Sequence, residues 1–187
     1  AAAEKDLTEF FMRWGLVPDA ETINYAGQFE KEERALYYLT DDARVYEIEH
    51  GVTGSIKGRD VIDGKTSVTV SDRIPNEVTV SIQSTADKDV ILGYEIARYQ
   101  YEDGVPVRQV IGFTTEDSYV DHVSTVNNRV MTYEVIAVDQ FGYRSNSKVI
   151  GDVRIAHDGS HDKSMWTVTT NMVSTDDGAG EAVEEDP

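Results

Sequence analysis

Cysteine is absent from all 187 residues of this chain. That absence excludes disulfide bonds, thiolate metal sites and cysteine nucleophiles. It does not identify the compartment, because bacterial secreted proteins also do without disulfides. Long apolar runs are missing as well, since none approaches the roughly 20 residues that a membrane-spanning helix needs. We therefore expect no membrane span.

Basic residues are scarce. The chain has 17 lysines and arginines against 35 aspartates and glutamates, a formal net charge of −18. A field of that sign repels phosphate backbones and anionic membrane surfaces, so nucleic acid is not an expected partner. The simplest interpretation of the charge is solubility.

Catalytic motifs are also missing from the sequence. It contains no His-Glu-x-x-His, no Gly-x-Ser-x-Gly elbow and no glycine-rich phosphate loop. The four histidines are His50, His122, His157 and His161. None is paired with another through a glutamate at helical spacing. The sequence therefore predicts that this chain is not an enzyme.

The first 50 residues show helical periodicity. The apolar positions of the first predicted helix are Leu7, Phe10, Phe11 and Trp14. Asp6 is placed as its cap, with Glu9 as the other half of a capping box, and Gly15 is placed to end it. Further helices are expected from Asp19, over residues 31–39 and over residues 41–50. We interpret the aromatic stripe as core packing, with these helices packed together and partly on the rest of the chain.

Residues 51–75 form a glycine-containing connection, with residues 67–70 as a candidate strand. From Asn76 the apolar period becomes two: Val78, Val80 and Ile82 alternate with polar residues. Further strands are expected at residues 91–101, 107–113, 118–120, 130–138 and 148–150. Short strands at this spacing predict an antiparallel β-sandwich over residues 76–150. The fold class is therefore α+β, a helical segment followed by a β-sandwich.

Residues 151–187 are predicted to be an extension and an acidic linker toward a further module, because residues 174–187 are poor in apolar side chains. The first five residues lack the features of a signal peptide, and the acidic last residues do not look like a natural end. We expect the chain to be a fragment of a longer polypeptide.

Two weak metal candidates lie in this extension. His157, Asp158, His161 and Asp162 fall within six residues and have side chains that suit zinc or similar ions. A turn explains the same residues and is favoured, since a firm site needs three or four fixed ligands. The acidic residues 176–186 could bind calcium weakly, but a solvated linker is favoured. We expect no cofactor in this chain.

Three aromatic residues are candidates for contact with a ligand. Trp166, Tyr99 and Tyr101 could stack on sugar rings, as amphipathic aromatic side chains do at glycan sites. Half-buried structural use is the favoured alternative for each of them.

The β-rich half resembles a known family. The relevant stretches are residues 93–96 (GYEI), 111–115 (IGFTT), 118–121 (SYVD) and 132–142 (TYEVIAVDQFG). This succession resembles the second half of a bacterial fibronectin type III domain. The resemblance implies a corner contact for Tyr133. Ile82 stands near the position where the family carries a core tryptophan.

The helical part resembles a second family. Residues 6–15 (DLTEFFMRWG) and 37–44 (YYLTDDAR) are similar to the C-terminal helices of enhancin-like zinc metallopeptidases, gluzincins that cleave mucin-type glycoproteins. The resemblance implies an extracellular, secreted or surface-attached bacterial multidomain protein with zinc in its catalytic domain.

Within such a protein, we expect this chain to be a non-catalytic accessory or spacer region. An adhesion module that binds glycans or proteins is the alternative. The expected partners are neighbouring domains of the same polypeptide and host glycans or glycoproteins.

Overall fold

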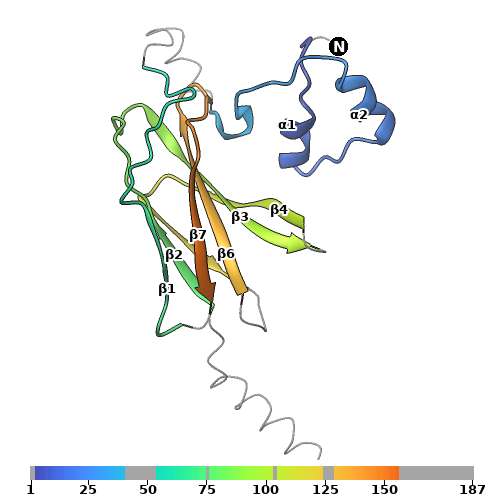
Figure 1. Cartoon of the computed structure of the whole chain (residues 1–187). Helices are drawn as coiled ribbons and strands as arrows, with labels where there is room; N and C mark the ends of the chain where they lie inside the picture. The colour runs from blue at the N-terminus through green and yellow to red at the C-terminus, as the bar shows by residue number, and fades with distance from the viewer. Residues whose placement is uncertain (1–2, 41–53, 75, 103–104, 124–128, 156–187) are drawn as a thin grey trace, which may run out of the picture.

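The computed structural model describes residues 3–40, 54–74, 76–102, 105–123 and 129–155 (Figure 1). Three short helices come first in these ranges: α1 (Thr8–Arg13), α2 (Ala20–Ala26) and the 3₁₀ helix η1 (Leu36–Tyr38). The strands that follow are β1 (Ser67–Val70), β2 (Glu77–Ser81), β3 (Ile91–Glu102), β4 (Val105–Thr114), β5 (Ser118–His122), β6 (Arg129–Asp139) and β7 (Lys148–Ile155).

Local signals set the ends of the first two helices. Gly15 has a φ of 77°, and the N–H of Leu16 reaches back to the carbonyl of Phe11 at 2.9 Å. This is the glycine-terminated end that the sequence predicts. The Asp19 carboxylate caps α2 by accepting from the Thr22 N–H at 2.7 Å.

Other helical predictions are wrong. Leu7 occupies the N-cap of α1, one residue after the predicted Asp6, although the Asp6 carboxylate accepts from the Thr8 N–H at 2.9 Å. The capping box with Glu9 does not form. Residues 31–39 contain only the three residues of η1, because the chain at Lys31 is held extended by a bridge to Asp6. The helix predicted over residues 41–50 lies outside the described residues.

The strands form two antiparallel sheets, with orders β1-β2-β5 and β4-β3-β6-β7. Their inward side chains meet in one core, which confirms a β-sandwich. Val78 and Val80 in β2 and Tyr133 and Val135 in β6 are fully buried, as the period of two predicts. Strand pairing extends to β1 before residue 76 and to Ile155 at the end of β7.

Two glycines allow close approaches at strands β3 and β4. A Cβ atom at Gly93 would lie 2.5 Å from the ring of Phe113 and 2.7 Å from the carbonyl oxygen of Thr114. A Cβ atom at Gly112 would lie 2.4 Å from the ring of Tyr119. Since heavy atoms do not approach so closely, Gly93 lets the Phe113 ring lie down on the sheet, and Gly112 leaves room for the Tyr119 ring.

A buried triad joins the two sheets. The Tyr133 hydroxyl donates to the Asp121 carboxylate at 2.8 Å, and Arg98 Nη1 donates to the same oxygen at 2.7 Å. Burial of the ring, together with the Asp121 carboxylate, raises the pKa of Tyr133 well above its ordinary value. The partner of Tyr133 is thus a side chain on β5. The sandwich is established, and its assignment to the fibronectin type III family stays a prediction.

Candidate functional site

The N-terminal segment contacts the outer face of the four-stranded sheet through η1, which confirms the expected contact between the two halves at that element. Figure 1 shows α1 and α2 beside one end of the sandwich, connected to it through η1. The Ala35 N–H donates to the carbonyl of Gly142 at 2.7 Å, beyond β6. The Tyr38 ring stacks on Phe113 of β4, with centroids 4.0 Å apart and planes at 20°.

A buried carboxylate lies under this contact. Glu95 of β3 alternates with the core residues Tyr94 and Ile96, so it points outward, yet it is only 1% exposed. Its oxygens accept from the Tyr38 hydroxyl at 3.0 Å and from Arg108 Nη2 at 3.0 Å.

Two further arginines stand near the same carboxylate. Arg144 Nη2 lies 3.7 Å and Arg13 Nη2 lies 3.9 Å from Glu95 Oε2. We call Glu95 and these four partners the Glu95 cluster. Because a buried charge is tolerated only when it is well paired, the cluster ties η1, α1 and the turn after β6 to the sheet.

A second carboxylate connects α1 to the same cluster. Glu9 Oε1 accepts from the Tyr37 hydroxyl at 2.8 Å and from Arg144 Nη2 at 3.1 Å. Lys31 Nζ lies 3.1 Å from the other oxygen, and Arg144 also bonds to the Tyr37 hydroxyl. Arg144 therefore bridges Glu9 of α1 and Glu95 of β3.

These contacts shift the acidity of the groups. Burial alone would raise the pKa of Glu9, but the hydrogen bond from Tyr37 and the charges of Arg144 and Lys31 outweigh it and hold the pKa below its usual value. Burial chiefly raises the pKa of Tyr37 well above its ordinary value, and the Glu95 charge adds to it. The Tyr37 hydroxyl therefore stays protonated at neutral pH, donating to Glu9 and accepting from Arg144.

The Glu9 interaction predicts a pH effect. A carboxyl whose folded pKa is depressed stabilises the fold above its unfolded pKa and loses that contribution as pH falls through the folded pKa. We expect Tyr37→Phe, which removes the bond that lowers the pKa of Glu9, to lose less stability than the native chain between about pH 6 and pH 3. Urea unfolding midpoints measured across that interval test this, with the exposed Tyr25→Phe as control. Equal losses in the native chain and the Tyr37 variant would contradict the assignment.

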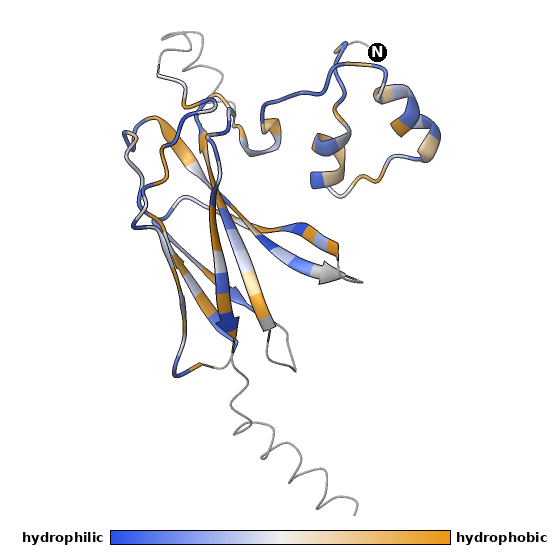
Figure 2. Cartoon of the chain, viewed as in Figure 1, coloured by the Kyte–Doolittle hydropathy of each residue, from blue (hydrophilic) through white to orange (hydrophobic). Residues whose placement is uncertain are grey.

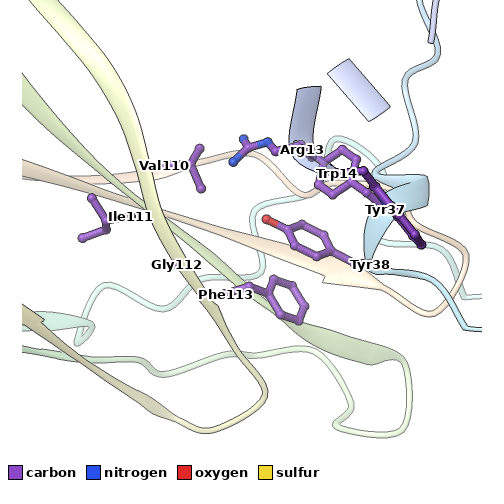
Figure 3. A pocket seen from close by; sticks show the side chains of 8 residues that line it. All are labelled: Arg13, Trp14, Tyr37, Tyr38, Val110, Ile111, Gly112 and Phe113. Carbon is purple, nitrogen blue, oxygen red and sulfur yellow. The ribbon is translucent and has the colours of Figure 1, made fainter. Parts of the chain in front are cut away.

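A hollow opens beside the Glu95 cluster, with a volume of about 300 Å³. It lies between α1, η1 and β4 and is lined by Arg13, Trp14, Tyr37, Tyr38 and Phe113 (Figure 3). Trp14 stacks on Phe10, with ring centroids 5.6 Å apart, and is 66% exposed. The prediction that Trp14 packs in a core is therefore wrong for this chain, because no described element covers its indole.

Most predicted site residues do not meet here. His157, Asp158, His161, Asp162 and Trp166 lie outside the described residues, as does the acidic stretch 176–186. Tyr99 is half-buried in β3, opposite Arg108 and Thr132. Tyr101 is also in β3, and its side chain is outside the described part.

The structure offers no metal centre in the ranges that it describes, where no group of three or more His, Asp or Glu side chains could hold an ion. Within those same ranges, no helix combines the length and apolar character that crossing a membrane requires.

Sequence analysis missed the Glu95 cluster. Charged residues at alternate positions of a strand are ordinarily solvent-facing, and Glu95, Arg108 and Glu134 fit that pattern. The available signal was three charged residues at outward positions of three neighbouring strands: Arg108 on β4 bonds to Glu95 on β3 and to Glu134 on β6.

Comparison with protein-family models and with curated proteins finds no match. Solved structures do match. The M60 catalytic domain of Clostridium perfringens ZmpC, in complex with the sialyl T antigen, is 28% identical at a TM-score of 0.51, over 80% of this chain and 26% of that chain. The ZmpB metallopeptidase of the same organism is 29% identical at a TM-score of 0.48, over 80% and 26%. This chain thus spans about a quarter of the length of each of these two structures.

The ZmpC neighbour is an M60-like, that is, enhancin-like, metallopeptidase domain, which confirms that part of the resemblance. The prediction that the chain is not an enzyme is corrected, because the ZmpC structure that it matches over 80% of its length is a catalytic domain. The motif search failed for a physical reason. A short metal-binding motif occupies few positions of a catalytic domain, so a segment can share that domain's fold without carrying the motif.

Proposed function

We propose that this chain is part of the catalytic module of an M60-like metallopeptidase that cleaves glycoproteins. The observation that carries the proposal is the extent of the match to the ZmpC catalytic domain, 80% of this chain. The stretch from Ser67 to Ile155 is shorter than four fifths of 187 residues, so the match extends beyond the strands of the sandwich.

The substrate class we propose is a mucin-type glycoprotein. The matched ZmpC domain is in complex with the sialyl T antigen, which is a glycan. An enzyme of this class would act outside the bacterial cell on host glycoproteins. Its partners would include neighbouring domains of the same polypeptide.

The catalytic zinc that the family implies does not fit the described residues. They contain no group of three or more potential ligands, and their one histidine, His122, has a side chain that is 71% exposed. We therefore route no chemical step through these residues. What they supply is a scaffold in which the Glu95 cluster fixes α1 and η1 against the sandwich.

A second candidate function is glycan binding by the hollow itself. It is favoured by the exposed indole of Trp14, which stacks on Phe10 beside a space of about 300 Å³. Aromatic faces of this kind can support a sugar ring.

The proposal is tested with the complete polypeptide in which we place this chain. We expect it to cleave a sialylated mucin-type glycoprotein, with cleavage abolished by a metal chelator and restored by zinc. The matched control is the same polypeptide without residues 1–187, which should lose activity because its module is incomplete. A complete, zinc-loaded polypeptide that leaves the glycoprotein intact would overturn the proposal.

A further inference from the structure

The two N-terminal helices expose an unusual amount of apolar surface. Neither α1 nor α2 contains a buried residue. Among the described residues, seven of the thirteen exposed large hydrophobic side chains fall within residues 11–25. They are Phe11, Met12, Trp14, Leu16, Val17, Ile23 and Tyr25, which we call the helical-pair surface. Figure 2 shows an apolar stretch in the turn between these helices, and apolar segments that alternate with hydrophilic ones along the helices.

Exposure of this kind is not the scatter that is normal on a protein surface. Val17 is 82% exposed, Trp14 is 66% and Leu16 is 60%. The glycine-terminated end of α1 fixes this arrangement, because the Leu16 N–H bonds back to the carbonyl of Phe11 at 2.9 Å. The turn therefore holds Leu16 and Val17 in the open instead of folding them under the helices.

The helices are also too short to be stable without packing. α1 has 6 residues and α2 has 7, whereas isolated helices shorter than roughly 12 residues are marginal in water. Polar contacts hold α1: Glu9 bonds with Tyr37 and Arg144, and the backbone of Asp6 bonds with residues 30–32. These contacts fix the position of α1 without covering the apolar side chains of the helical-pair surface.

We infer that the helical-pair surface is an internal docking face, on which an apolar segment of the same metallopeptidase polypeptide packs. The inference rests on the proposed function. It commits to this occupant because the matched ZmpC structure is about four times longer than the part this chain covers, so a catalytic module has ample further chain to supply it. The hollow beside Trp14, about 300 Å³ in volume, is the socket for that segment's side chains.

Charge supports an apolar occupant over an ionic one. The charged groups nearest the hollow are already paired, Arg13 with Glu9 and Glu95, and Arg144 with the same two carboxylates. The charges of the two arginines and the two carboxylates balance, so the set offers no net charge to an ion. The exposed remainder of the surface is aromatic and aliphatic.

Hydrogen exchange tests the inference without any substitution. The chain alone and the complete polypeptide are compared at the backbone amides of residues 8–26. We expect exchange to be at least about 10-fold slower in the complete polypeptide, because docking suppresses local opening. Amides of β6 in the sandwich core serve as the internal control and should change little. Equal exchange of residues 8–26 in both samples would overturn the inference.

A matched pair of variants gives a second measurement. Trp14→Ser and Val149→Ser each remove an exposed apolar side chain, 66% and 52% exposed in this chain. In the complete polypeptide only Trp14→Ser should speed proteolysis within residues 8–26, by about 10-fold or more. In the chain alone neither variant should change the rate. Equal rates for the two variants in the complete polypeptide would count against the docking face.

Other occupants give distinct results. If a sialylated glycopeptide shifts the tryptophan fluorescence of the chain alone, and Trp14→Ser abolishes the shift while amide protection is unchanged, the hollow is a glycan site and the inference fails. A stable dimer of the complete polypeptide that Trp14→Ser dissociates also overturns it. The complete polypeptide could also cleave no glycoprotein and yet show slower exchange at residues 8–26 than the chain alone. That result would contradict the proposed function and support the docking face.

Discussion

Replacement of Glu95 by glutamine is expected to lower the free energy of unfolding by about 3 kcal/mol. Glu95 is 1% exposed and receives a hydrogen bond from Tyr38 and one from Arg108. Removal of its charge leaves positive groups partly uncompensated at a buried position. The loss lies at the low end of the range for broken buried pairs, because Arg108 keeps Glu134 and Arg144 keeps Glu9.

The variant should also release the N-terminal segment. Tyr38 is held over the sheet by its bond to Glu95 and by its stack on Phe113. Without the bond, we expect faster proteolysis in residues 8–26 and unchanged protection in the β2 core.

Urea unfolding and limited proteolysis measure both effects. Glu116→Gln is the matched control, since Glu116 is exposed and its side chain should contribute within about 0.5 kcal/mol. If Glu95→Gln and Glu116→Gln unfold at the same urea concentration, the Glu95 charge does not stabilise the fold.

The sandwich was predictable because its signal is local. Val78, Val80 and Ile82 alternate with polar residues along one strand, and burial follows that alternation directly. Tyr133 and Val135 repeat the pattern on β6. A period of two in the sequence and one covered face of a sheet are two descriptions of the same constraint.

The helical half was less predictable because its structure depends on distant residues. Residues 31–39 carry a helical pattern, yet Ala35 bonds to Gly142, and Tyr38 stacks on Phe113. These partners lie far along the chain, so propensity within a short window cannot include them. Glu9 is a similar case: the sequence places it in a capping box, but in the fold it accepts from Tyr37 and pairs with Arg144.

The candidate site was the least predictable part. The Glu95 cluster draws on residues 13, 38, 108 and 144, and only the folded chain brings them together. The exposure of Trp14 could not be predicted either, because its local pattern favours burial. Its apolar spacing does predict burial, but within the described ranges no element supplies the covering surface. We ascribe that cover to the rest of the proposed catalytic module.

Asp139→Ala is expected to destabilise the chain by about 4 kcal/mol, the largest effect of any aspartate in the described ranges. The carboxylate is fully buried at the end of β6. One oxygen accepts from the N–H groups of Phe141 and Tyr143 at 3.0 and 2.9 Å. The other accepts from the Ser55 hydroxyl at 3.0 Å and the Ile56 N–H at 3.1 Å.

Removal of the carboxylate leaves three backbone N–H groups without this acceptor, and each unsatisfied buried donor costs about 1–3 kcal/mol. Asp139→Asn should cost roughly half as much, because its amide oxygen still accepts while its NH₂ faces donors. Asp117→Asn is the surface control: it breaks only the exposed pair with Lys88 and should cost about 0–1 kcal/mol. An Asp139→Ala midpoint equal to that control would show that the turn does not depend on this carboxylate.

The same turn carries the contacts that hold the N-terminal segment. Gly142 accepts from the Ala35 N–H, and Arg144 joins Glu9 to Glu95. Because Asp139 fixes the backbone at residues 141 and 143, its loss should loosen α1 and η1 together with the turn. We therefore expect Asp139→Ala to speed amide exchange at residues 8–38 more than at the β2–β5 pair. Equal acceleration at both places would show that the turn does not hold the N-terminal helices.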